Sequence, residues 1–292
     1  KTLKKEEEAL LRRADKAVRR FDRKQWKLWT KALPKRLRRE AFDPPVFEHL
    51  ALRRWQEAFE QHHRAVLENT QDQWHQLRIA VKRLRYVVEN FLPQRQVEWG
   101  KDLHHLQDLL GEVHDLDVLW GRLCSLGDDF TPEQRKAWSE IIDRERSNRL
   151  EQYKRLTAGE HSLWQKWRQG LPDGEDLEQA SLACLKAWAS CRDHKIDRAE
   201  NVCALSLQLF NALVSRDSLS GKAVRHGHRL VQAAAWMHRL AGDPPQPERA
   251  GDVLEDIRSL RPPIGWTAQH LERLIEILER LWGVEFQADT GQ

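Results

Sequence analysis

Apolar residues recur at intervals of three and four positions along almost the whole chain, and prolines and glycines interrupt the pattern. This spacing places apolar side chains on one face of an α-helix, so it predicts amphipathic helices that pack on one another. The alternation of apolar and polar residues that marks a β-strand is nearly absent. We therefore expect an all-α fold, made of a helical bundle and a second, smaller all-α lobe.

Turn-forming residues divide the chain into predicted helices and regions. The first helix is expected over residues 3–33 and ends at Pro34; the others are expected at about 47–67, 72–92, 97–123, 132–156, 176–191, 198–215, 222–241, 250–260 and 267–282. The strongest candidate boundary is the turn-rich sequence GLPDG at residues 170–174. We predict a bundle over residues 1–170, a linker over 171–177 and a second helical domain over 178–292.

Composition restricts the class of protein. No apolar stretch reaches the roughly 18 residues that a membrane-spanning helix needs, so we expect no membrane span. Residues 1–8 are densely charged and show no apolar leader. The four cysteines form no Cys-x-x-Cys pair, as expected for reduced thiols. These features predict a cytoplasmic protein.

Charge is distributed unevenly along the chain. Residues 1–125 contain 26 Lys and Arg against 19 Asp and Glu, whereas residues 126–292 contain 23 against 26. Within residues 1–40 the balance is 16 against 6. This excess predicts a polyanionic partner for the first region.

The most informative segment is WHQLRIAVKRLRY, residues 74–86. At about 100° per residue, four basic side chains fall within an arc of about 80° on one helix face, opposite an apolar face. These four are His75, Arg78, Lys82 and Arg85. Like charges at this spacing repel one another by a few tenths of a kcal/mol per pair. Phosphates along the row would offset that repulsion through charge-assisted hydrogen bonds.

A second basic stripe lies in the first predicted helix. Its members share one helix face in that prediction: Lys16, Arg19, Arg20, Arg23 and Lys27. Two such helices side by side would form a basic groove or channel. An ordinary solvated face is the alternative for either stripe, although an acidic partner at i+4 is rare in the row of residues 75–85, where Glu89 follows Arg85.

Two motifs resemble those of CHAD domains, the conserved histidine α-helical domains. The first is HQLRIAVKRLRY at residues 75–86, and the second is LQDLLGEVHDLDV at residues 106–118. The resemblance implies a helical bundle that binds inorganic polyphosphate through His75, Arg78, Lys82, Arg83 and Arg85. It further implies that Gly111 allows close helix packing, that Asp115 orients a basic neighbour, and that the protein associates with polyphosphate granules.

The resemblance departs from the family pattern at one point. Family members carry the His/Arg helix twice, and this sequence shows a copy that resembles the second occurrence. Residues 1–33 look like the stretch that lies between the two copies, so the chain is expected to lack the N-terminal bundle or to be a fragment. We therefore expect a one-sided groove and not a complete pore.

The second region resembles the HD-type C-terminal helical domain of exopolyphosphatase/guanosine pentaphosphatase proteins. The resembling segments are residues 198–210, 230–242, 264–266 and 271–281. HD phosphohydrolases hold a divalent metal with His and Asp ligands. Here Arg198 replaces the first His, and Arg239 replaces the Asp after His238; an arginine cannot ligate a metal. The resemblance implies a degenerate, non-catalytic lobe without metal or other cofactor.

Two further functions compete with polyphosphate binding at this point. One is a metal-dependent HD phosphohydrolase that acts on polyphosphate or on a phosphorylated nucleotide. The other is nucleic-acid binding, which the same cations allow. The tryptophans, such as Trp26, Trp29, Trp55 and Trp74, are more typical of a core than of a surface that stacks bases.

Overall fold

The computed structural model describes residues 2–39, 44–126, 130–192, 196–216 and 221–283, and within them every regular element is an α-helix. The all-α prediction is therefore confirmed. The chain divides into two units, Lys1–Phe42 and Asp43–Gln292, each of which is described by itself. None of the helices in the described ranges is long and apolar enough to cross a membrane.

The first unit contains α1 (Thr2–Arg20) and α2 (Arg23–Arg39). A single helix over residues 3–33 was expected, and that prediction is wrong. The carboxylate of Asp22 accepts hydrogen bonds from the backbone N–H groups of Lys24 and Gln25, both at 2.9 Å, and so starts a new helix. Helix α2 also continues through Pro34. Trp26 and Trp29 are exposed in this unit.

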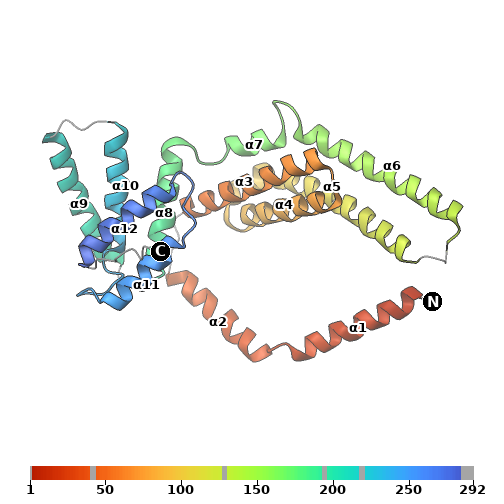
Figure 1. Cartoon of the computed structure of the whole chain (residues 1–292), viewed down its shortest axis with the longest axis horizontal. Helices are drawn as coiled ribbons and strands as arrows, with labels where there is room; N and C mark the ends of the chain where they lie inside the picture. The colour runs from red at the N-terminus through yellow and green to blue at the C-terminus, as the bar shows by residue number, and fades with distance from the viewer. Residues whose placement is uncertain (1, 40–43, 127–129, 193–195, 217–220, 284–292) are drawn as a thin grey trace, which may run out of the picture. The chain divides into compact units, whose positions relative to one another are not determined.

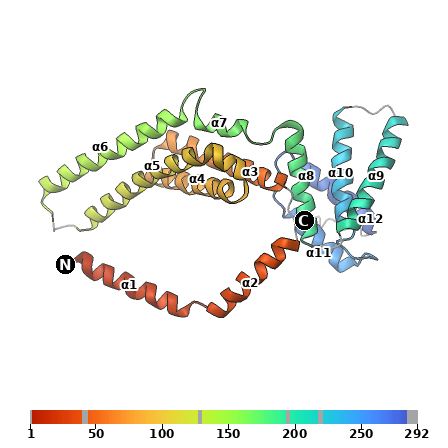
Figure 2. The same cartoon turned by 180° about the vertical axis from the view of Figure 1, so that it is seen from behind.

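The second unit begins with a bundle of five helices. They are α3 (Pro44–Glu68), α4 (Gln71–Phe91), α5 (Pro93–Ser125), α6 (Pro132–Thr157) and α7 (Leu163–Gln169). Helix α4 packs against both α3 and α5, as both views show (Figures 1 and 2). Their apolar faces form one core with Trp55, Trp74 and Tyr153, in which the rings of Trp74 and Tyr153 meet edge to face at 5.3 Å.

The remaining helices are α8 (Gly174–Ser190), α9 (Ile196–Arg216), α10 (Lys222–Met237), α11 (Pro247–Arg258) and α12 (Ala268–Trp282). A second apolar cluster joins α8, α10, α11 and α12. Helix α10 packs against α8, α9 and α12 (Figure 1). The clusters lie on either side of the turn at residues 170–174, with Leu171 buried in the first. The boundaries 1–170, 171–177 and 178–292 stay predictions.

Candidate functional site: the basic seam between α4 and α5

Helix α4 presents a fully apolar face to the core and a basic face away from it. Thr70 caps the helix by accepting a hydrogen bond from the backbone N–H of Gln73. Leu77, Val81, Leu84 and Val88 are completely buried. The four basic side chains of the row, His75, Arg78, Lys82 and Arg85, are each partly buried. The core thus fixes the direction of the basic face.

Helix α5 contributes a second stripe that faces this row. A single residue, Leu92, separates the two helices, which therefore run antiparallel. The stripe consists of residues at intervals of three and four positions: His104, Gln107, Gly111 and His114. We call the row of α4 and this stripe together the basic seam. At one end Nδ1 of His75 lies 3.3 Å from Nδ1 of His114.

Arg78 lies over Gly111 in the middle of the seam. A Cβ atom added to Gly111 would meet a single nearby atom outside its own helix backbone, Nε of Arg78 at 4.0 Å. The expectation that Gly111 allows close packing of helix backbones is therefore wrong. A larger side chain at position 111 would instead lie against the guanidinium of Arg78.

The other end of the seam carries its one carboxylate. Glu89 Oε1 lies 3.6 Å from Nε of Arg85 and 3.2 Å from Nε2 of His104. The ring of Tyr86 lies beside both neighbouring cations, 5.1 Å from the Arg85 guanidinium and 5.5 Å from Nζ of Lys82. Among the residues that the structure describes, no carboxylate forms an ion pair with Arg78, Lys82 or Arg83.

Three buried polar atoms in the seam lack a hydrogen-bond partner. They are Nε of Arg78, Nε of Arg85 and Oε1 of Gln107. A buried polar group without a partner costs roughly 1–3 kcal/mol, and more when it is charged. Two of the three are donors of charged groups, so an anion that accepted their hydrogen bonds would recover part of this cost.

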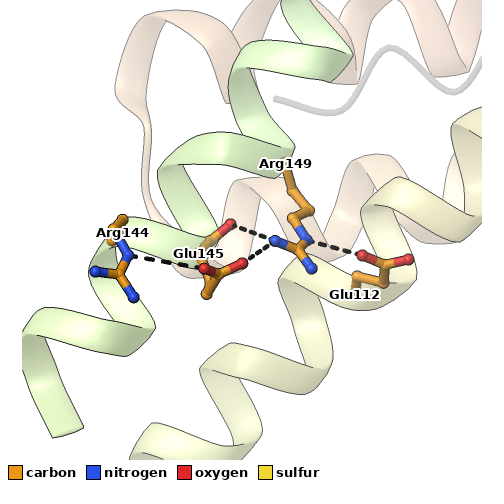
Figure 3. A network of polar contacts seen from close by, with 4 residues as sticks. All are labelled: Glu112, Arg144, Glu145 and Arg149. Carbon is orange, nitrogen blue, oxygen red and sulfur yellow. Dashed lines mark hydrogen bonds and ion pairs between the residues drawn. The ribbon is translucent and has the colours of Figure 1, made fainter.

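Three acidic residues of α5 form ion pairs with cations of α6 and α7. Arg146 pairs with Asp117 at 2.9 Å, and Lys166 pairs with Asp102 at 2.6 Å. In Figure 3 the guanidinium of Arg149 lies between Glu112 of α5 and Glu145 of its own helix. Because these carboxylates already have partners, they leave the seam cations unneutralised. Among the residues that the structure describes, Asp117 rather than Asp115 forms an ion pair with a basic neighbour.

The basic groups of the seam affect the pKa of His114. Its pKa is lowered by partial burial and then by the nearby His75 and Arg78, although Asp115 and Asp117 act in the opposite direction. Protonating His114 is unfavourable because the ring is partly buried and because His75 and Arg78 lie nearby. The nearby basic groups favour a bound anion.

The other predicted site residues lie elsewhere. Arg83 is exposed and lies about 100° around α4 from Lys82. The N-terminal stripe is split between two helices, with Lys16, Arg19 and Arg20 on α1 and Arg23 and Lys27 on α2. All five are exposed, and Arg19 pairs with Asp15 at 2.8 Å. A groove between two basic helices stays a prediction.

Sequence reasoning missed the α5 half of the seam. The signal was present, since His104, Gln107, Gly111 and His114 recur at helical spacing and a very short turn connects the two helices. Tyr86, whose ring lies beside Lys82 and Arg85, was also missed as a site residue.

Residues 1–124 match the family model of the CHAD domain. The match to the CHAD domain ends within α5 and contains both halves of the seam. No curated protein and no solved structure matches the chain.

The HD resemblance of residues 178–292 lies outside the CHAD match and stays a prediction. Arg198 is exposed on α9, whereas Arg239 lies 3.4 Å from the carboxylate of Asp243. His238 Nδ1 lies 2.6 Å from the backbone oxygen of Ala235. In the described part of the chain, no three His, Cys, Asp or Glu side chains form a group that could hold a metal ion.

Proposed function

We propose that this chain binds inorganic polyphosphate along the basic seam and catalyses no reaction on it. One observation carries the proposal: in the described ranges, four aligned basic side chains have a single carboxylate, Glu89, within ion-pair distance. The match of residues 1–124 to the CHAD domain supports the same class of ligand.

The shape of the seam favours a linear polyanion over a single phosphate ion. Residues 75–85 span about 15 Å of helix, which one phosphate cannot bridge. Arg78 and Arg85 each have a buried Nε donor without an acceptor, nearly two helical turns apart. A chain of phosphate groups reaches both donors and passes Lys82 between them. Each contact is a charge-assisted hydrogen bond.

The deciding experiment uses a pair of charge-matched variants. Arg78→Gln with Lys82→Gln removes two unpaired cations of the seam. Lys154→Gln with Arg155→Gln removes the same charge from the exposed surface of α6. We expect the seam variant to lose retention on immobilised long-chain polyphosphate and the α6 variant to keep it. Equal retention of both variants, at unchanged melting temperatures, would refute the seam as the binding site.

Competition separates polyphosphate from nucleic acid. Soluble polyphosphate should release this protein from immobilised polyphosphate at a lower concentration than single-stranded RNA of equal total charge does, because the seam offers closely spaced cations. The aromatic ring beside them, Tyr86, already contacts Lys82 and Arg85. Preferential displacement by RNA would contradict the proposed ligand.

A further inference from the structure

A second basic site lies in the other half of the second unit, in a pocket of about 570 Å³ between α8, α10 and α12. Helix α10 packs on both of the other helices (Figure 1). The charged and titratable side chains that line the pocket are Glu178, Arg225, His226, Arg229, His270 and Arg273. Its size is within the range of small-molecule sites.

Positive groups outnumber negative ones in this pocket. Three guanidinium groups line it together with one carboxylate, Glu178, which pairs with Arg229. Arg273 pairs with Glu276 at 2.7 Å on the surface of α12, and both side chains are more than half exposed. An exposed pair of this kind contributes little and is readily exchanged for another partner. Among the described residues, no carboxylate pairs with Arg225.

Two imidazole rings stand side by side in the same pocket. The rings of His226 and His270 lie 4.5 Å apart. The backbone N–H of Thr267 donates to Nδ1 of His270 at 2.9 Å, so the neutral ring carries its proton on Nε2, where it is a donor. Burial, His226 and Arg229 lower the pKa of His270, in that order. The pocket thus disfavours further positive charge.

Arg229 has hydrogen-bonding capacity that its ion pair leaves unused. Its Nε atom is buried and has no partner, and its side chain is only 18% exposed. An unsatisfied donor on a buried charge is costly. The first turn of α12 adds the positive end of a helix dipole, because Gln269 and His270 also line the pocket.

We propose that this pocket binds a small compound that carries a diphosphate group. Three guanidinium groups, arranged around a cavity too large for a single phosphate, match two linked phosphates with several charged oxygens. The inference goes beyond the proposed function, since none of these residues belongs to the basic seam. Inorganic pyrophosphate and ADP carry the same group and serve as the two probes.

The test measures binding of each probe to the whole chain by isothermal titration calorimetry. Arg225→Gln and Arg273→Gln change exposed side chains, so they should leave folding intact. We expect each to weaken binding about tenfold, the effect of losing one charge-assisted hydrogen bond. Arg249→Gln, an exposed arginine on α11 without an ion pair in the described residues, is the matched control and should leave affinity unchanged.

A variant that gains affinity guards against effects of misfolding. Glu178→Gln removes the one carboxylate of the pocket and frees the guanidinium of Arg229, so pyrophosphate should bind more tightly. Tighter binding of ADP than of pyrophosphate would identify a nucleotide as the source of the diphosphate group, and the reverse would identify an inorganic source. Absence of binding by both probes at millimolar concentration would overturn the proposal.

The two proposals can fail separately. Arg78→Gln with Lys82→Gln should leave pyrophosphate binding unchanged, because both residues lie on α4. If that variant abolishes pyrophosphate binding while the three pocket variants have no effect, the pocket proposal is refuted and the seam proposal stands. If the seam variant keeps full retention on long-chain polyphosphate, the seam proposal is refuted and the pocket proposal is unaffected.

Discussion

Nδ1 of His75 lies 3.3 Å from Nδ1 of His114, across the boundary between α4 and α5. At this distance one nitrogen donates and the other accepts, so the two rings cannot both be fully protonated without losing the contact. Arg78 lies close enough to lower the pKa of His114 as well. The contact between the two rings therefore depends on the charge in the seam.

The first prediction concerns the pH dependence of polyphosphate binding. The pKa of His114 is below its ordinary value of 6.5 in the free protein. A bound polyanion should raise it, because negative charge offsets His75 and Arg78. Protonation then favours the bound state, so affinity should increase as pH falls from 8 to 6. Calorimetry at both pH values, with an NMR titration of the His114 ring, measures the effect.

His114→Gln is the control for this pH dependence. The amide keeps hydrogen-bonding capacity but cannot titrate, so the increase in affinity at low pH should shrink. A pH dependence that is identical in the variant would assign the linkage to other groups.

The second prediction concerns Gly111. Gly111→Ala should stabilise the protein by about 0.5–1 kcal/mol, since alanine is the better helix residue and its Cβ meets Arg78 Nε only at 4.0 Å. Gly111→Leu should instead cover the guanidinium of Arg78 and weaken polyphosphate binding. Thermal unfolding and column retention measure the two effects. Severe destabilisation by Gly111→Ala would instead indicate that helix backbones pack closely at this position.

The third prediction separates two aspartates of the second motif. The side chains of Arg146 and Asp117 are 18% and 10% exposed, and they pair at 2.9 Å. Asp117→Asn should destabilise the fold by about 2 kcal/mol, because it leaves a largely buried guanidinium without its carboxylate. Asp115→Asn, at an exposed position, should change stability by less than about 0.5 kcal/mol. Urea unfolding of both variants provides the comparison.

The fourth prediction is a loss of stability in mild acid. His49 accepts a hydrogen bond from the backbone N–H of Ile264, and burial followed by Arg53 lowers its pKa to about 4. Nδ1 of His62 forms a hydrogen bond of 2.7 Å with the hydroxyl of Tyr153, and burial followed by His63 lowers the pKa of His62 to about 4. Both contributions are complete above the ordinary pKa of 6.5 and are lost as pH falls toward 4.

The slope of this loss is calculable. Between pH 6.5 and 4 each of these histidines binds a proton in the unfolded chain and not in the folded chain. As pH falls through this range, each histidine therefore lowers the free energy of unfolding by at most about 1.4 kcal/mol per pH unit. His49→Gln and His62→Gln should each reduce the slope of unfolding free energy against pH, measured between pH 6.5 and 5, by the contribution of one titrating group. Slopes equal to that of the unchanged protein would show that these rings titrate normally.

The fifth prediction is a steep salt dependence. Binding along the seam releases counterions from the polyanion, so the logarithm of the affinity should fall linearly with the logarithm of salt concentration. The Arg78→Gln, Lys82→Gln variant should show a shallower slope than Lys154→Gln, Arg155→Gln. Parallel lines for the two variants would mean that the removed seam cations do not touch the polymer.

The sequence predicts one half of the candidate site well. Leu77, Val81 and Leu84 leave α4 a single apolar face, so the direction of Arg78 and Lys82 follows from helical spacing alone. Helix α6 also begins at a signal that can be read in the sequence, since Thr131 and Gln134 form a reciprocal capping box.

What the sequence could not provide depends on tertiary partners. That Glu112 and Asp117 point to arginines of α6, and not to the row of α4, is decided by which helix packs on which side of α5. The break at Asp22 was missed for a local reason. An aspartate within a strongly amphipathic stretch can be a surface residue or a cap, and periodicity does not distinguish the two.

All the groups of the basic seam lie within 40 consecutive residues, His75 to His114, on two helices joined by one residue. Bringing neighbours in the chain together costs little loop-closure entropy, whereas the contact between His49 and Ile264 joins positions 215 apart. The hairpin of α4 and α5 can therefore assemble early in folding, before the distant halves of the chain meet.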